Sequence, residues 1–218
     1  MLRYTEVPLL ALSDRLDVVY YLIRESVLNE LGRRPTTPLS ELCVPIRTKT
    51  PAREAYVPEG VPCIKLRNVT GEMLNLSNCA YIPERLKDKF VAAKSKDIIV
   101  TATGEGTAGR ADIFLESSTY IVTGENILLR PKLDRTNPFY LLAMLRTDHI
   151  AKQLTHYVRG ATGQTHLYWH DIGNIEVPDA DKKVQQECER LFKEAAELRK
   201  KSNDVLMRFK ATGAAVMT

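Results

Sequence analysis

Apolar positions at helical spacing mark the N-terminal part of the chain. Ser13 is suited to cap a helix that ends near Gly32. The positions with this spacing are Leu16, Val19, Ile23 and Val27. We therefore expect a helix over about residues 13–31. A proline-dense loop region with short elements is expected to follow it, from Pro35 to Pro62.

The middle of the chain carries short runs rich in Ile and Val that are typical of β-strands. They read "VPCIKLRNV", "DIIVTAT", "ADIFLES" and "TYIVTGENILLRP". Gly71, the loop 104–109 and Gly124 separate these runs. The pattern predicts a central region that is mainly β.

Helical spacing returns in "PFYLLAMLRTDHIAKQL", with Thr136 or Asn137 as the cap and Pro138 in the first turn. A much longer helix is predicted to begin at Pro178 and Asp179 and to end just before Gly213. Together these patterns predict an α+β fold with a mainly β centre, flanking helices and one long C-terminal helix.

The long helix carries apolar or small residues at alternating steps of four and three, which is the spacing of a coiled-coil seam. The seam positions are Val184, Cys188, Leu191, Ala195, Leu198, Ser202, Val205 and Phe209. Such a stripe could pack on its own domain, but the sustained period and the small or polar residues Ala195 and Ser202 favour a partner helix. At about 1.5 Å per residue the helix reaches roughly 45 Å, so we expect it to project.

Composition limits the classes of protein that fit the chain. Its 218 residues are 27% charged with a formal net charge of +4, so a basic surface must be local. The four cysteines form no C-x-x-C pair, and no apolar run approaches the length of a membrane span. The start of the chain also lacks the pattern of a secretory signal. We expect a soluble cytoplasmic protein with reduced thiols and no membrane partner.

Several patterns resemble catalytic or cofactor motifs, and each has a simpler interpretation. Gly104, Gly106 and Gly109 match G-x-G-x-x-G, but a strand-like run follows them where a dinucleotide site needs a helix. "TNPFY" is explained by helix capping. "HLYWH" lacks the Glu of H-E-x-x-H, and "YWHDIGNIEVP", which overlaps it, is predicted to form strand and turn rather than a zinc-bearing helix. No nucleophile elbow is present. The sequence predicts no enzyme, no cofactor and no metal site.

A polar loop precedes the long helix, in residues 157–178. Its glycines permit close backbone approach, and its side chains are rich in hydrogen-bond donors: Arg159, Thr162, Gln164, Thr165 and His166. Arg and Gln pair with guanine and adenine edges, and Thr and His bond phosphate or base. The same composition would also suit a solvated surface turn.

These segments, in this order, resemble the target recognition domain of type I restriction-modification specificity subunits. Lys96 to Ile99 stand for the family's "GD-I-L" segment before a glycine loop, and Gly163 to Thr165 for its "G-x-T-Q" loop. The run Ile175 to Pro178 and then Gln185 or Gln186 matches its "I-x-I-P" stretch before a Gln-bearing helix. The resemblance extends from about residue 38 to 210.

The chain departs from the family pattern at several points. Lys96 replaces a glycine, Gln164 and Thr165 are in reversed order, and "DADKKVQQE" stands for "P-x-x-E-Q". Family members carry two recognition domains and two long helices, whereas this chain has one of each. It resembles a half-subunit, with a recognition domain over residues 1–178 and a coiled-coil spacer helix over 179–212.

The resemblance implies a non-catalytic reader of double-stranded DNA that docks methyltransferase subunits and, in restriction complexes, a nuclease subunit. A homodimer is expected, because a second copy supplies an identical seam. The candidate DNA contacts are Lys65, Arg67, Asn68, Arg110, Arg159, Thr162, Gln164 and His166. Lys and Arg would chiefly hold phosphates, while Gln164, Asn68 and Arg159 would read bases.

Two other functions remain open from the sequence alone. One is a coiled-coil interaction protein that never contacts DNA. The other is a nucleotide-binding oxidoreductase or methyltransferase fragment that uses the glycines at 104–109.

Overall fold

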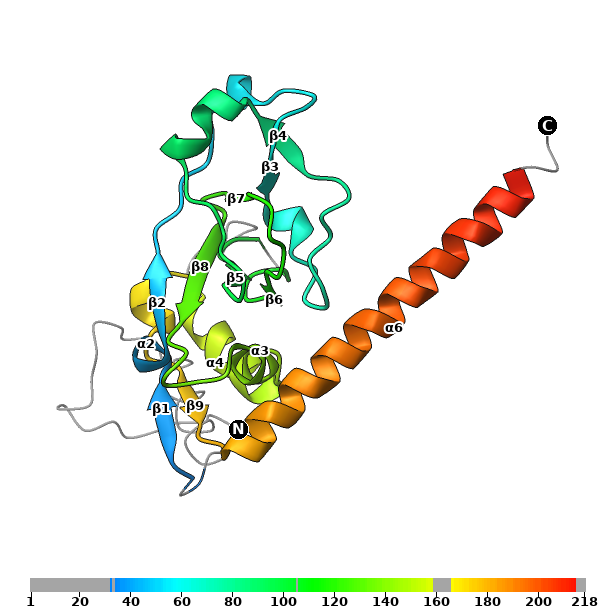
Figure 1. Ribbon diagram of the computed structural model, residues 1–218. Helices are drawn as coiled ribbons and strands as arrows, with labels where there is room; N and C mark the ends of the chain where they lie inside the picture. The colour runs from blue at the N-terminus through cyan, green and yellow to red at the C-terminus, as the bar shows by residue number, and fades with distance from the viewer. Residues whose placement is uncertain (1–31, 33, 105, 159–165, 215–218) are drawn as a thin grey trace, which may run out of the picture.

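A four-stranded antiparallel sheet forms the centre of the computed structural model, which describes residues 32, 34–104, 106–158 and 166–214 (Figure 1). Its strands lie in the order β2 (Cys43–Ile46), β8 (Asn126–Pro131), β5 (Ile98–Thr101) and β6 (Ala111–Ile113). The strand-like runs of the sequence supply β5, β6 and β8, so their prediction is confirmed. The helix expected over residues 13–31 lies outside the described residues.

Both faces of this sheet are buried, and alternate residues of each strand enter different cores, as the pleat of a β-strand requires. Ile98 and Val100 pack into one cluster, whereas Ile99 between them packs into another. On β8, Leu129 and Leu128 divide in the same way. The sheet is therefore the middle layer of the domain.

Helices cover one face of the central sheet. They are α2 (Leu39–Leu42), α3 (Pro138–Leu145), α4 (Asp148–Tyr157) and α5 (Trp169–Ile172), and the antiparallel ribbon of β1 (Thr36–Pro38) and β9 (Glu176–Pro178) lies with them. Asn137 caps α3 by accepting hydrogen bonds from the N–H groups of Phe139 and Tyr140, with Pro138 in the first turn. The capping interpretation of "TNPFY" is confirmed.

A smaller sheet forms the other side of the domain. Its strands are β4 (Ala80–Ile82), β3 (Val61–Ile64) and β7 (Ile121–Val122), and β3 pairs with β7 in parallel. Three 3-10 helices lie in the same half of the chain: η2 (Arg53–Ala55), η3 (Leu66–Asn68) and η4 (Glu84–Lys89). The turn after β3 places η3 at the end of the central sheet, which matters for the site.

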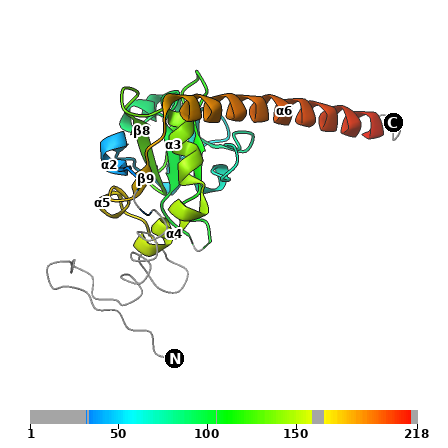
Figure 2. The same ribbon diagram turned by 90° about the horizontal axis from the view of Figure 1, so that it is seen from below.

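The long helix α6 (Lys182–Ala214) leaves the domain at its base and projects beyond it, as expected (Figures 1 and 2). Its first turns pack on α3, where Phe192 lies 5.3 Å from Phe139 between ring centroids. Asn137 donates to Glu189 and, through its backbone, to Gln185. The helix is thus anchored at one end.

Both predicted ends of α6 were wrong. Asp179 is held by β1, because Thr37 donates to its carboxylate, so the helix begins at Lys182 with Asp181 accepting from the Val184 N–H. At the far end the helix continues through Gly213 to Ala214. One glycine in a helix costs only about 1 kcal/mol, so it does not force a stop.

Two further predictions need correction. The run after Pro138 forms two helices, since Thr147 ends α3 by donating to Met144 O and begins α4 by accepting from Ile150 N. "YWHDIGNIEVP" was read as strand and turn, but Trp169–Ile172 is one helical turn before β9. A four-residue helix has too little sequence to show a helical period.

The observed class is α+β with a sheet-rich centre and one long C-terminal helix, which confirms the predicted fold class. None of the helices in the described part of the chain combines the length and the apolar content that a bilayer crossing requires.

Candidate nucleic-acid interface

Three segments that are far apart in the sequence meet at one end of the central sheet. They are the glycine loop (Ala102–Arg110) after β5, the turn at η3, and the chain that re-enters at His166. Leu167 N donates to Ala102 O at 2.7 Å, and Thr103 pairs with His166 as an isolated bridge. Glu125 joins the other two, because its backbone O accepts from Ala102 N and its carboxylate from Leu66 N. We call this region the loop end of the sheet.

The glycine loop has a defined conformation that needs its glycines. Gly104, Gly106 and Gly109 have φ values of +97°, +68° and +91°, a region that side chains disfavour. Thr101 ties the loop together, since its hydroxyl donates to Thr107 O and accepts from Arg110 N. The expectation of glycines at positive φ is confirmed.

The segment after the glycine loop is a strand. Arg110 leads directly into β6, which pairs with β5, so the three glycines close a β-hairpin. In a dinucleotide site a helix comes directly after the glycine loop and its N-terminus receives the pyrophosphate, whereas the element described directly after this loop is the strand β6. The sequence interpretation of strand, glycine loop and strand is therefore confirmed.

The structure corrects the role predicted for Asn68. Its side chain is fully buried, with 0% of its surface exposed. Its amide accepts from Lys65 N at 2.8 Å and donates to Asn75 O at 2.7 Å. Asn68 therefore fixes the η3 turn and the loop after it, and it is not placed to read a base. Sequence alone gives no sign of this burial, because the partner lies in an irregular loop.

Among the predicted cations, Arg67 and Arg110 are exposed at the loop end of the sheet. Arg67 donates to Asn78 O at 2.9 Å, and Arg110 donates to Gly106 O at 3.3 Å. Lys65 is more enclosed, since its ammonium lies 4.8 Å from the Tyr56 ring centroid and 4.0 Å from a Glu125 carboxylate oxygen. The two arginines are thus the better-placed phosphate ligands.

Of the polar loop, residues 157–158 and 166–178 are described. Arg159, Thr162 and Gln164 lie outside the described residues. His166 is described, and it begins a row of stacked rings that sequence reasoning missed. The His166 and Tyr168 centroids are 6.1 Å apart, and those of Tyr168 and His170 are 5.6 Å apart. The sequence does contain a sign of this row, because rings at every second position of an extended chain point to the same side.

A buried ion pair supports the loop end of the sheet and was also missed. The Asp112 carboxylate accepts from Thr70 N at 2.7 Å, Gly71 N at 3.3 Å and Arg146 Nη2 at 2.6 Å. Burial raises the pKa of Asp112 above its ordinary value, while these donors act in the opposite direction. The pair holds the turn at Gly71 against Arg110, whose Cγ would lie 3.7 Å from a Cβ added at Gly71.

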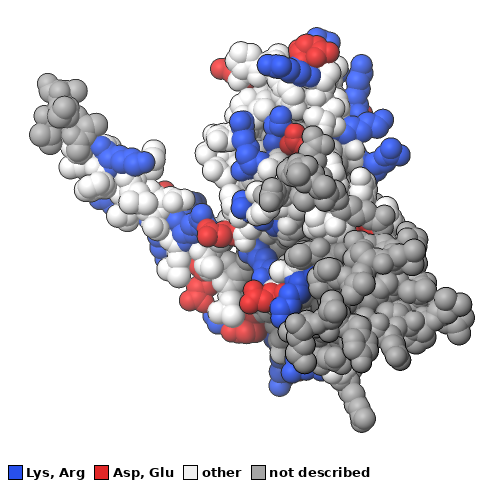
Figure 3. Space-filling view, turned by 180° about the vertical axis from the view of Figure 1, so that it is seen from behind, with Lys and Arg blue, Asp and Glu red and all other residues white. Residues whose placement is uncertain are grey.

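A shallow pocket of about 280 Å³ lies beside Arg110 and Arg146, between the glycine loop and the helices α3 and α4. Figure 3 shows Lys and Arg side chains over the upper part of the domain, around β3 and β4, with fewer Asp and Glu among them. The net charge of the chain is modest, so this clustering supports the expectation of a local basic surface.

The predicted seam of α6 lies at the helix surface. Its large apolar residues are about half exposed or more, from 48% at Val184 to 75% at Phe209. Ala195 and Ser202 are exposed as well. Cys188 differs, because it packs against the domain core together with Phe192. One seam position is thus shared with the domain, and Leu191, Leu198 and Val205 remain open to a partner.

The described residues offer little for covalent or metal chemistry. No group of three His, Cys, Asp or Glu side chains within the described ranges could hold a metal ion. Burial raises the pKa of the Cys43 thiol to about 12 and that of Cys63 to about 11, so both thiols stay protonated at neutral pH. Protonated buried thiols are poor nucleophiles.

Comparison with known proteins finds similarity of structure only. No protein-family model matches the chain, and no curated protein matches its sequence. The HsdS subunit of Thermoanaerobacter tengcongensis matches with a TM-score of 0.52 and 15% identity over 83% of this chain and 44% of its own. The type I restriction-modification S subunit of M. genitalium matches with a TM-score of 0.51 and 15% identity over 78% and 40%.

A third solved structure, the type IIG restriction endonuclease BpuSI, matches with a TM-score of 0.60 and 11% identity over 80% of this chain and 28% of its own. The chain spans less than half the length of each of these three proteins. The resemblance read from the sequence is confirmed at the level of fold. The chain therefore has the fold of one half of a type I restriction-modification specificity subunit.

Proposed function

We propose that this chain is the DNA sequence-recognition subunit of a type I restriction-modification system and that each copy reads one half-site. The observation that carries the proposal is the loop end of the sheet. There the glycine loop that ends at the exposed Arg110 pairs with the segment that re-enters at His166, and the exposed Arg67 lies on the η3 turn that Glu125 joins to this loop, on a domain with the fold of a specificity subunit. A DNA-reading surface needs two kinds of group: cations that bind phosphates, and hydrogen-bonding side chains that reach the base edges.

In this proposal the contacts have separate roles. Arg67 and Arg110 hold phosphates, with a smaller contribution from Lys65, whose charge is shared with Glu125. Arg159, Thr162, Gln164 and His166 face the groove, and Gln164 and Arg159 read bases. Residues up to 178 form the recognition domain. The helix that follows is the spacer and dimerisation element.

The chain supplies no catalytic step itself in this proposal. Methyltransferase subunits dock on it and supply the methyl transfer, and a nuclease subunit joins in restriction complexes. Two copies form a homodimer through the seam of α6, because a lone stripe of half-exposed apolar residues is stabilised when an identical stripe covers it. The complex works in the cytoplasm, where its DNA is.

Two-fold symmetry determines what the target looks like. A spacer helix of 33 residues at about 1.5 Å each is roughly 50 Å long, which exceeds one turn of DNA at about 34 Å. The two recognition domains then contact separate half-sites. The methylated site should be two inverted copies of one short sequence around an unread gap.

The test is to sequence methylated positions in cells that express the chain with its methyltransferase subunit. Gln164→Ala should relax one base pair in both half-sites by about 1 to 3 kcal/mol of discrimination. Arg135→Ala is the matched control, because this exposed arginine lies beyond the opposite end of β8 and should leave the motif unchanged.

Three results would contradict the proposal. One is an asymmetric motif, and another is the absence of any sequence-specific methylation. The third is a motif that stays unchanged in every alanine variant of Arg159, Thr162, Gln164 and His166. The last outcome would move base reading to another part of the domain.

A further inference from the structure

The far end of α6 carries a group of strongly exposed apolar side chains. Phe209 is 75% exposed, and Val205 and Leu206 beside it are 60% and 53% exposed. All residues from 200 to 212 are exposed, well beyond the anchored turns at Phe192. A cluster of this kind at the end of a projecting helix marks a contact surface.

Charge divides the helix region into two unlike halves. Residues 179–198 contain six acidic and four basic side chains, whereas residues 199–214 contain five basic and one acidic. Figure 3 shows Asp and Glu near the base of the helix and Lys and Arg toward its far end. A parallel pair would place like halves together, so complementarity favours an antiparallel pair of two copies.

The seam spacing fixes one register for that antiparallel pair. Centring the two seams on each other places Val184 of one copy opposite Phe209 of the other, and Leu191 opposite Ser202. The flanking charges agree with this register. Glu187 then lies near Arg208 of the second copy, and Glu194 near its Lys201.

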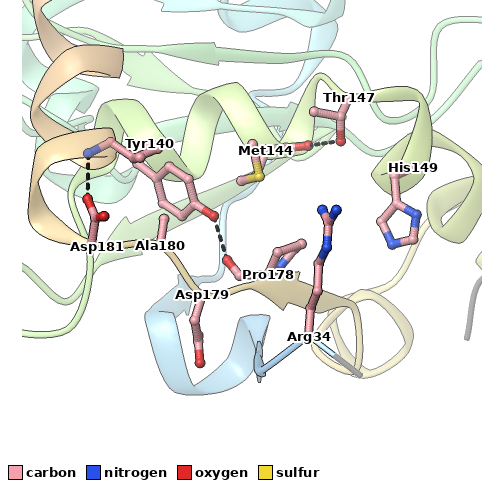
Figure 4. Close-up of a pocket in the computed structure, with 10 residues that line it drawn as sticks. Arg34, Tyr140, Met144, Thr147, His149, Pro178, Asp179, Ala180 and Asp181 are labelled. Atoms are coloured by element: carbon pink, nitrogen blue, oxygen red, sulfur yellow. Dashed lines mark hydrogen bonds between the residues drawn. The ribbon is translucent and has the colours of Figure 1, made fainter. Parts of the chain in front are cut away.

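The base of the helix has a pocket where the second copy's helix end would arrive. Its volume is about 810 Å³, within the range of pockets that enclose small molecules, and Val184 is part of its lining. Figure 4 shows Met144 of α3 and Arg34 pointing into the space between α3 and β9, with Tyr140 and His149 beside them. Thioether, aromatic and guanidinium groups all pack favourably on an aromatic ring.

We infer that this pocket receives the Phe209 side chain of a second copy, so that each copy's helix end completes the base of the other. The inference rests on the homodimer of the proposed function and adds its register and its anchor. Phe209 leaves water for a lined pocket, and the seam between Val184 and Phe209 is covered along its whole length. The two pockets are equivalent by symmetry.

A cross-link tests the register. In a Cys188→Ser background the double variant Leu191→Cys with Ser202→Cys should form an intermolecular disulfide on mild oxidation, because the two thiols face each other in the antiparallel pair. Each single variant is the control. Its two copies would lie about 16 Å apart, at 11 residues of about 1.5 Å each, and should stay uncrosslinked. Efficient cross-linking of Leu191→Cys alone would indicate a parallel pair and overturn the inference.

Methyl NMR of the five methionines tests the pocket. The Met144 methyl resonance, assigned with Met144→Leu, should be shifted by the Phe209 ring in the dimer. Phe209→Leu should remove that shift while the chain remains dimeric. Met207→Leu is the matched control, because Met207 is 67% exposed on the same turn but points away from the seam.

The dimer dissociation constant gives the size of the effect. Phe209→Ala should raise it on the order of 100-fold, because two buried rings are lost, and Met207→Ala should change it by less than about threefold. If the Met144 methyl chemical shift of the dimer does not change in Phe209→Leu, the inference that the pocket binds Phe209 is wrong, while the proposed function is unaffected. A wild-type chain that sediments as a monomer at micromolar concentration would overturn the homodimer itself.

Discussion

The glycine loop allows a stability prediction that compares Gly104 and Gly106, which lie two residues apart in the same loop. Gly104 has φ +97°, and a Cβ added there would lie 2.4 Å from Thr107 Oγ1. Gly106 has φ +68°, and an added Cβ would meet nothing within 4 Å. Alanine at either position adopts a disfavoured backbone conformation, but only Gly104→Ala also creates a steric overlap.

The backbone term is similar at both sites. A positive φ costs an alanine about 1 to 2 kcal/mol, and the loss of a glycine's freedom in the unfolded chain offsets about 0.4 to 1 kcal/mol. At Gly104 the Thr107 side chain must also rotate, which breaks its hydrogen bond of 3.1 Å to Thr103 O, worth about 1 kcal/mol. We expect a loss of about 2 to 3 kcal/mol for Gly104→Ala and about 1 kcal/mol for Gly106→Ala.

Equilibrium urea unfolding measures this difference. With a slope of about 2 kcal/mol/M, Gly104→Ala should lower the midpoint by roughly 1 M or more and Gly106→Ala by about half as much. Thr107→Ala removes the clashing hydroxyl, so the double variant Gly104→Ala with Thr107→Ala should cost less than the sum of its parts by about 1 kcal/mol. Equal costs at the two glycines, or additive costs in this cycle, would refute the reasoning.

Two other predictions concern single side chains. Arg110→Ala should weaken binding to specific and random DNA alike and lower the slope of log K against log salt by about 1, whereas the control Arg135→Ala should leave that slope unchanged. Fluorescence anisotropy over a salt series measures both slopes. Equal slopes for the two variants would show that Arg110 does not contact a phosphate. Lys96→Gly should stabilise the fold by about 0.5 to 1 kcal/mol, because Lys96 is the one non-glycine residue of the described ranges with a positive φ, at +75°. Thermal unfolding measures the effect, and a midpoint that stays the same or falls would contradict the prediction.

Lys96 also shows how local geometry can be read from sequence. The family that the chain resembles has glycine at this position, and the turn from Lys94 to Asp97 requires a left-handed residue there. Asp97 accepts from Lys94 N at 2.8 Å and from Arg130 through two bonds, so the turn is held in spite of the lysine. The surrounding contacts offset the backbone cost.

The sequence by itself determined the features that depend on neighbours within a few residues. The apolar run Ile98, Ile99 and Val100 predicted a strand, Asn137 and Pro138 predicted the start of α3, and the three glycines predicted a turn. Each of these follows from backbone sterics or from hydrogen bonds within one turn. Because these features depend only on residues close together in the chain, they can be predicted from the sequence.

The tertiary structure alone decided which distant segments meet. His166 pairs with Thr103, 63 positions earlier in the chain. Asn68 was predicted to read a base, but its side chain is buried and hydrogen-bonded to the backbone of Lys65 and Asn75. On α6, Cys188 and Leu191 belong to one stripe, yet the first packs on the domain and the second is open, because the crossing of α6 over α3 covers only part of the helix. Burial and adjacency depend on where whole elements pack, and residue spacing within one element does not specify that.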